Sequence, residues 1–190
     1  MEHPVARGPN FVYGKQFVLD AYGRDTWNRV LARMPDPAAG VWKGIFLATE
    51  VYPFSAFKAM ATALAQETGM RNDAELARMY SFIADQSLNR IYKVFFRLAN
   101  PSFVIGNYPK LWTRFFAAGQ VEVPESGREH ATVVFTLPEM FLDWLPPACL
   151  GFSTKAVEMA GGRELTQQQR GKTRVAAGEW QITFDLRWRE

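Results

Sequence analysis

The stretch GEWQITFDLRW, residues 178–188, alternates strictly between apolar and polar side chains. In an extended chain successive side chains point to opposite faces, so one face of this segment is apolar and the other polar. The apolar face holds Trp180, Ile182, Phe184, Leu186 and Trp188, and the polar face holds Gln181, Thr183, Asp185 and Arg187. This pattern is typical of a strand that covers a hydrophobic core on one side and meets water on the other.

Other strands precede this one in the C-terminal part of the chain. The segments 120–123 and 129–138 read as strands, and the segments 163–168 and 172–177 read as two more. The second of these joins the last strand in a hairpin across Ala177–Gly178. A short helical turn before Pro146–Pro147 and a helix that carries Cys149 interrupt the strands.

Helical signals dominate the N-terminal part. We expect helices over 24–34, from Pro53 to Gly69, and from Asn72 to Asn100, where Asn72 and Glu75 form a capping box. Tyr80, Ile83, Ser87, Ile91 and Val94 mark one face of the last of these helices. Residues 102–119 continue the helical periodicity, 44–51 read as a strand, and 10–23 fit a strand or a helix equally. The order predicts an α+β fold with N-terminal helices packed on a C-terminal, mainly antiparallel sheet.

The length of the chain fits one domain. With 190 residues, a chain buries roughly 70% of the surface that its unfolded form exposes. The loops at 35–40 and 124–127 are short and read as connections within a domain. We therefore expect residues 1–190 to form a single domain.

Charge and composition limit the classes of partner. The net charge is +3 and the isoelectric point about 9.1. Basic and acidic residues are interspersed without a run of like charges, so we expect no nucleic-acid partner. No stretch approaches the ~18 uninterrupted apolar residues of a spanning helix, so we expect no membrane span.

The single cysteine and the first residues favour a cytoplasmic location. Cys149 excludes a disulfide within the chain and a thiolate-rich zinc site. The first residues, MEHPVARGPNFVYG, carry Glu2, Pro4 and Pro9 before any apolar run, which argues against a signal peptide.

Catalytic signatures are missing from the sequence. There is no G-x-S-x-G, GxxxxGK[ST] or GxGxxG motif, and neither His3 nor His130 stands at metal-ligand spacing from a second ligand. Carboxylate pairs such as Asp20 with Asp25 lie among polar loop residues. We therefore expect no enzyme activity, no catalytic residue, no metal and no cofactor.

Aromatic residues are unusually frequent in this sequence. Phe, Trp and Tyr make up 14% of the chain, and such rings must be buried or must line an interface or a pocket. Tyr108, Trp112, Phe115 and Phe116 form a helical stripe. A core is the simpler interpretation, but large rings pack with clefts between them that bind apolar molecules. The candidate ligand-binding residues are Tyr108, Trp112, Phe116, Trp144 and Phe152.

The C-terminal segment 149–186 resembles the C-terminal half of the 4-vinyl reductase domain. That family has a helix that begins near a Cys, a Gly-bounded turn, a strand, and a final hairpin of pattern C-x-x-x-G-x-x-x-C-x-F-x-V. Gly178, Phe184 and Leu186 occupy its glycine, aromatic and aliphatic positions. Upstream, the segments 23–35, 52–64 and 95–123 resemble a myxobacterial paralogous family of unknown function that shares this fold.

The resemblance implies a superfamily with haem–nitric-oxide sensors, TRAPP vesicle-tethering subunits and ligand-sensing domains of aromatic-responsive regulators. Its members commonly form dimers and often hold a small or lipid-like molecule in an apolar cavity. In its zinc-bearing sensors, the metal ligands fall on Cys149, Gly171, Arg174 and Ile182 of this chain, and only the first could bind zinc. The haem sensors need a helical histidine and a Tyr-x-Ser-x-Arg motif, and this chain has neither.

Losing the metal leaves burial alone to hold the final hairpin. Five apolar residues of the last strand, at roughly 1.5–3 kcal/mol for each fully buried large side chain, contribute on the order of 10 kcal/mol before entropy is subtracted.

Three functional hypotheses follow from these features. The first is a non-enzymatic domain that binds a small apolar or lipid-like ligand and acts through protein partners, as a homodimer or with another protein. The alternative is a protein-interaction module with a closed core and no ligand. A tetrapyrrole reductase follows only from the domain's historical name, and it lacks a motif for a donor cofactor.

Overall fold

A computed structural model describes residues 4–98 and 100–190, with side chains given outside 90–98. The predictions for His3 and for the side chains of Ile91 and Val94 lie outside the described residues. The N-terminal elements are β1 Val5–Arg7, α1 Gly8–Arg33, α2 Asp36–Trp42, β2 Val51–Pro53, α3 Phe54–Thr68 and α4 Asn72–Leu98. The C-terminal elements are α5 Pro101–Gly106, α6 Tyr108–Phe115, β3 Gln120–Ser126, β4 His130–Pro138, the 3-10 turn η1 Glu139–Phe141, α7 Leu145–Met159, β5 Arg163–Ala176 and β6 Glu179–Arg189.

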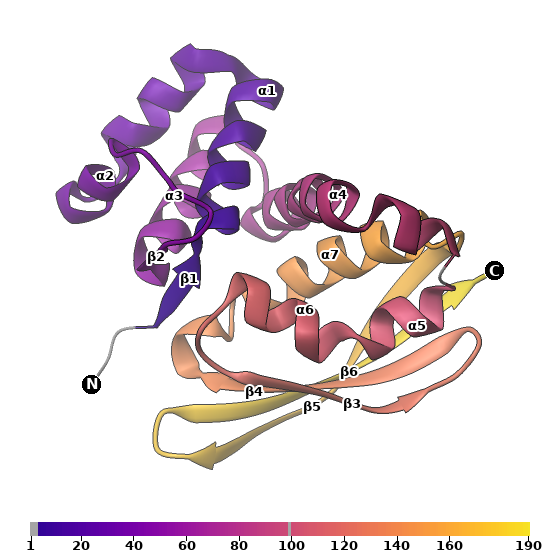
Figure 1. The fold of residues 1–190 in the computed structure, drawn as a ribbon. Coiled ribbons are helices and arrows are strands. Elements are labelled where there is room, and N and C mark those ends of the chain that lie inside the picture. The colour runs from indigo at the N-terminus through magenta and orange to yellow at the C-terminus, as the bar shows by residue number, and fades with distance from the viewer. Residues whose placement is uncertain (1–3, 99) are drawn as a thin grey trace.

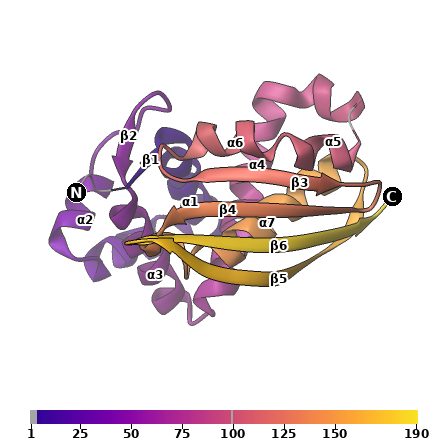
Figure 2. The ribbon, with the colours of Figure 1, turned by 90° about the horizontal axis from the view of Figure 1, so that it is seen from below.

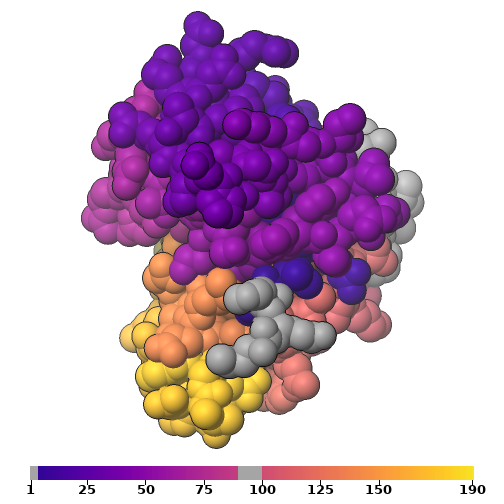
Figure 3. All heavy atoms as spheres, turned by 90° about the vertical axis from the view of Figure 1, so that its left-hand side faces the viewer, coloured from indigo at the N-terminus to yellow at the C-terminus, as the bar shows by residue number. Residues whose placement is uncertain are grey.

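The fold is α+β, as the sequence predicts. The main sheet is antiparallel throughout, with strand order β3-β4-β6-β5. Helices α5, α6 and α7 cover one face of it, and no helix of the described residues lies on the opposite face (Figures 1 and 2). The N-terminal helices stand above this layer, and Figure 3 shows them as one mass over the C-terminal part. None of the helices in the described ranges is long and apolar enough to cross a membrane.

The last strand has the two faces that its alternation predicts. Ile182, Phe184, Leu186 and Trp188 are buried, and Trp180 is half-buried. Gln181 and Arg187 between them are exposed. The hairpin turns where predicted, with Gly178 at φ 77°, a left-handed conformation that glycine adopts without steric cost. β6 lies between β4 and β5 in the sheet, so its apolar face lies in the middle of the core.

Helix boundaries follow the local signals closely. α3 begins directly after Pro53 and ends at Gly69, whose φ of 69° gives the left-handed cap expected of glycine. α4 begins at Asn72 as predicted and runs to Leu98. The helical stripe over 102–119 is split into α5 and α6 just before Pro109.

Several local predictions are wrong. Residues 44–50 form a loop rather than a strand, because Ile45 and Leu47 point into solvent and only Val51–Pro53 pairs with β1. Residues 163–176 form one strand, β5, rather than two, since pairing with β6 continues through bulges. The ambiguous segment 10–23 is helical and belongs to α1, which bends at Gly23, where φ is 80°.

Glu75 does not form the capping box that the sequence predicts at the start of α4. Its carboxylate is buried and accepts hydrogen bonds from the Tyr22 hydroxyl at 2.8 Å and from Arg78 at 3.2 Å. A buried carboxylate needs such partners more than a helix end needs a cap. Glu75 therefore ties α4 to α1.

A buried asparagine joins the N-terminal helices to the C-terminal layer. Asn10 of α1 donates through Nδ2 to the Phe115 carbonyl at the end of α6, at 2.7 Å. Its Oδ1 accepts from the Tyr80 hydroxyl of α4 at 2.9 Å. β1 lies beside the same end of α6, with Ala6 bridged to Phe116. Asn10 thus connects three helices at one buried point.

Candidate functional site: an aromatic cavity

The five candidate ligand-binding residues surround one small cavity. Tyr108 and Trp112 come from α6, Phe116 follows it, Trp144 precedes α7, and Phe152 lies within α7. The cavity has a volume of about 30 Å³. That is room for one or two waters, since a water needs roughly 10–15 Å³ on this measure. The structure thus brings the five side chains together, and ligand binding by them stays a prediction.

Ring packing explains why so little space is left. Trp112 stacks on Phe116 with ring centroids 4.3 Å apart. The Trp144 ring meets Phe116 edge-on at 5.0 Å, and Tyr108 lies 5.8 Å from Phe152. Offset and edge-on contacts of this kind are the favoured arrangements of aromatic rings. The aromatic surplus of the sequence is therefore mostly core, with a residual gap between the rings.

Seven further residues line the cavity: Tyr80, Leu111, Phe115, Phe135, Leu145, Ala148 and Cys149. Phe115 belongs to the predicted aromatic stripe and Phe135 to the alternating apolar face of β4. Tyr80 lies on the apolar face predicted for α4, but that stripe does not say which neighbour it would contact. Ala148 and Cys149 stand on the face of α7 that carries Phe152, a signal that the sequence does contain.

The polar atoms at the cavity wall form a small neutral network. The Tyr108 hydroxyl lies 3.7 Å from Cys149 Sγ and accepts from Ser153 Oγ at 3.3 Å. Burial raises the pKa of Cys149 to about 11, against a smaller opposing effect of the hydrogen bonds that Cys149 makes with Tyr108 and with Ser153. Burial also raises the pKa of Tyr108 and of Tyr80 well above the usual value. At neutral pH all three groups keep their protons.

We expect Cys149 to be unreactive in the folded protein. A thiol with a pKa of about 11 is almost entirely protonated at pH 8, and the thiolate is the reacting species. Labelling by a thiol reagent at pH 8 should be at least ~100-fold slower than for the same chain in guanidinium, because thiolate is scarce and access is blocked. Mass spectrometry of timed samples measures both rates. Equal rates would show that the thiol is accessible.

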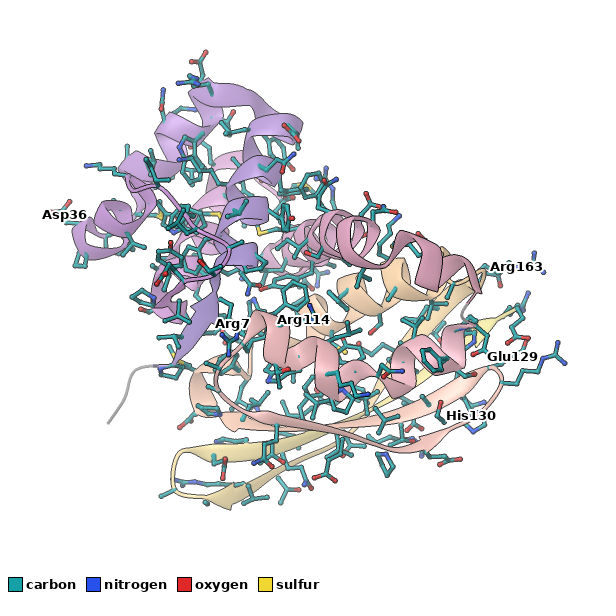
Figure 4. The ribbon with its side chains drawn as sticks, in the orientation of Figure 1. Arg7, Asp36, Arg114, Glu129, His130 and Arg163 are labelled. Carbon is teal, nitrogen blue, oxygen red and sulfur yellow. The ribbon has the colours of Figure 1, made fainter. Side chains whose placement is uncertain are left out.

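Of the positions that correspond to metal ligands, only Cys149 lines the cavity, and neither His130 nor Gly171, Arg174 and Ile182 does. His130 begins β4 at the far end of the sheet, exposed, with Nε2 3.2 Å from Glu125 Oε1 (Figure 4). Arg174 is exposed on β5, whereas Cys149 and Ile182 are buried. Within residues 4–98 and 100–190, no group of three or more His, Cys, Asp or Glu side chains is placed to hold a metal ion.

Comparison with solved structures places the fold among H-NOX domains. The Fe(II) unliganded H-NOX protein from K. algicida covers 97% of both chains, with a TM-score of 0.71 at 14% identity. A mutant of T. Tengcongensis H-NOX covers 97% of this chain and 98% of its own, with a TM-score of 0.72 at 9% identity. An oxygen-binding H-NOX domain related to soluble guanylate cyclases covers 94% and 93%, with a TM-score of 0.69 at 7% identity.

These identities establish a shared fold and nothing further about chemistry. No protein-family model matches the chain, and no curated protein matches it in sequence. The likeness supports the α+β fold that the sequence resemblance implies.

Proposed function

We propose that this protein is a non-catalytic ligand-binding domain that holds a small apolar molecule in the aromatic cavity and acts through protein partners. The carrying observation is the cavity wall, which consists of rings, aliphatic side chains and three groups that stay protonated. Such a wall provides neither a general base nor a charged nucleophile. A volume of about 30 Å³ admits a molecule of one to a few heavy atoms.

One solved structure that shares this fold is an Fe(II) H-NOX protein, and another comes from work on haem redox potential. Haem nevertheless does not fit this chain. Aromatic rings occupy the cavity, which leaves far less space than the 300–1,000 Å³ typical of cofactor-sized sites. His130 is remote and exposed, and the buried Cys149 thiol lies against Tyr108 and Ser153 beside a cavity of about 30 Å³, which leaves no room for a macrocycle. We therefore propose a haem-free member of this fold.

The remaining features of the proposal rest on the sequence. We propose that residues 1–190 act as one domain. We also propose that the chain is related to the 4-vinyl reductase and myxobacterial paralogous families, because Gly178, Phe184 and Leu186 match the hairpin pattern of the 4-vinyl reductase domain. A single buried thiol suits the cytoplasm. We further propose a homodimer or another protein partner, a contact that would bury the exposed apolar loop residues Ile45 and Leu47.

Xenon is a suitable probe for the cavity, because it is apolar and close to the size of the space. We expect pressurised xenon to shift the methyl resonances of Leu145, which lines the cavity, in a saturable manner. The Ala148→Leu variant should lose this response, because the added side chain fills the gap. Exposed Ala74→Leu on α4 is the control. Haemin added to the wild-type chain should produce no bound Soret band.

A second candidate function, the closed interaction module, is favoured by the small cavity volume. A linear, non-saturating xenon response at Leu145 in the wild-type chain would support it and overturn the ligand-binding proposal. A stoichiometric Soret band would instead refute the haem-free interpretation. Both results come from the wild-type chain and do not depend on whether a variant folds.

A further inference from the structure

A second and larger hollow lies on the outer side of α6. We call it the α1–α6 groove, after the start of α1 and the helix α6 that border it, with α4 between them. Its volume is about 610 Å³, within the ~300–1,000 Å³ of small-molecule sites. Leu88 of α4 and Leu111 and Phe115 of α6 give it apolar walls. The groove is thus already open to a molecule of moderate size.

Two arginines give the groove its charge. Arg7 ends β1 and Arg114 lies on α6, and Figure 4 shows both between the N-terminal helices and the C-terminal layer. Arg7 donates from Nε to the Thr113 carbonyl at 2.8 Å. This hydrogen bond holds the Arg7 guanidinium beside α6 and uses one of its five N–H donors. Among the described residues that line the groove, none is acidic. The N-terminal end of the long helix α1 adds positive potential at the same place.

A buried hydroxyl provides an independent indication of a ligand. Ser87 lines the groove, and only 5% of its surface is exposed. Its Oγ has no hydrogen-bond partner among the described residues. Leaving a buried hydroxyl unpaired carries a desolvation penalty. The Oγ atom itself is covered in the structure, so a ligand oxygen in the groove would remove that penalty once the Ser87 side chain turns to expose it.

We infer that the α1–α6 groove binds an anionic amphiphile, a carboxylate that carries an unbranched apolar chain. Guanidinium groups pair with carboxylates through short, charge-assisted hydrogen bonds. Arg7 and Arg114 hold the head, Leu88, Leu111 and Phe115 cover the chain, and Ser87 supplies one further donor. A neutral chain of the same length would have the apolar contacts alone.

This site is distinct from the aromatic cavity. Leu111 and Phe115 line both, so α6 is the wall between the two spaces. The groove needs no movement of the cavity rings, and it can bind its ligand whether or not the cavity binds xenon. Leu88 lines the groove and Leu145 lines the cavity, which makes their methyl groups separate reporters of the two sites.

Titration with decanoate and with decanol tests the inference on the full chain. We expect decanoate to bind in a saturable manner by calorimetry and to shift the methyl resonances of Leu88. Decanol should bind at least about tenfold more weakly, because it lacks the charge that the arginines recognise. Arg114→Gln should weaken decanoate binding by a similar factor and leave decanol unchanged. Arg24→Gln, an exposed change elsewhere on α1, should alter neither.

Each alternative outcome overturns the inference. Equal affinity for decanoate and decanol would show that the groove recognises no anion. Shifts at Leu145 without shifts at Leu88 would place the ligand in the cavity, and an unchanged affinity in Arg114→Gln would remove that residue from the site. If Arg114→Gln lowers the melting temperature, Arg114→Lys retains the charge and should restore most of the affinity.

Discussion

Replacing Phe184 by alanine is expected to lower the free energy of unfolding by about 3–5 kcal/mol, the range for truncating a buried phenylalanine. Phe184 is fully buried in the middle of β6, and its ring lies 5.9 Å from that of Phe135 on the neighbouring strand. Its removal takes apolar surface out of the core and leaves a cavity that the paired strands cannot close. Urea unfolding followed by circular dichroism measures the change.

The control is Gln181→Ala, on the same strand with its side chain exposed, for which we expect a change within about 0.5 kcal/mol. EDTA should leave the urea midpoint of the wild-type chain unchanged, because the described residues include no cluster of metal-ligand side chains. A loss below about 1 kcal/mol in Phe184→Ala would contradict the view that burial holds the final hairpin. A lower midpoint in EDTA would point to a metal instead.

Asn10→Leu is the second substitution for which we expect a large effect, a loss of about 2–4 kcal/mol of stability. The change leaves the Phe115 carbonyl and the Tyr80 hydroxyl without the hydrogen bonds that Asn10 makes to them in a fully buried setting. Each unpaired buried group carries a desolvation penalty of roughly 1–3 kcal/mol. Urea unfolding again measures the difference.

A double-mutant cycle with Tyr80→Phe separates this effect from lost packing. Tyr80→Phe removes the hydroxyl, so in that background Asn10→Leu leaves one fewer buried polar group unpaired. The loss of stability caused by Asn10→Leu should then be about 1–2 kcal/mol smaller. Simple additivity of the two substitutions would show that the Tyr80–Asn10 hydrogen bond contributes nothing to stability. In that case this hydrogen bond would not help to hold α4 against α1.

The candidate cavity was accessible from sequence only in part. Tyr108, Trp112 and Phe116 share a helical stripe, and Trp144 and Phe152 follow as large rings in the next helical region, so their convergence could be expected. The space between them could not, because a gap of about 30 Å³ depends on how rings from separate elements interlock. Nothing in the local pattern distinguishes that gap from a pocket ten times larger.

The α1–α6 groove gave no signal in the sequence at all. Arg7, Ser87 and Arg114 lie far apart along the chain, and each is ordinary in its own segment. Asn10 is similar, since its partner Phe115 lies 105 residues away. The loop over 44–50 was missed for a related reason, because β-propensity forms a strand only where a partner strand is present.

The sequence by itself determined that helices come first and a mainly antiparallel sheet follows, and it determined the faces of the last strand and the ends of α3. Those features follow from periodicity and from the backbone preferences of proline and glycine, which act over a few residues. Only the tertiary structure decided the size of the aromatic cavity, the charged groove and the buried contacts of Asn10 and Glu75. They depend on side chains from distant segments, whose positions are set by close packing of the whole core rather than by any local pattern.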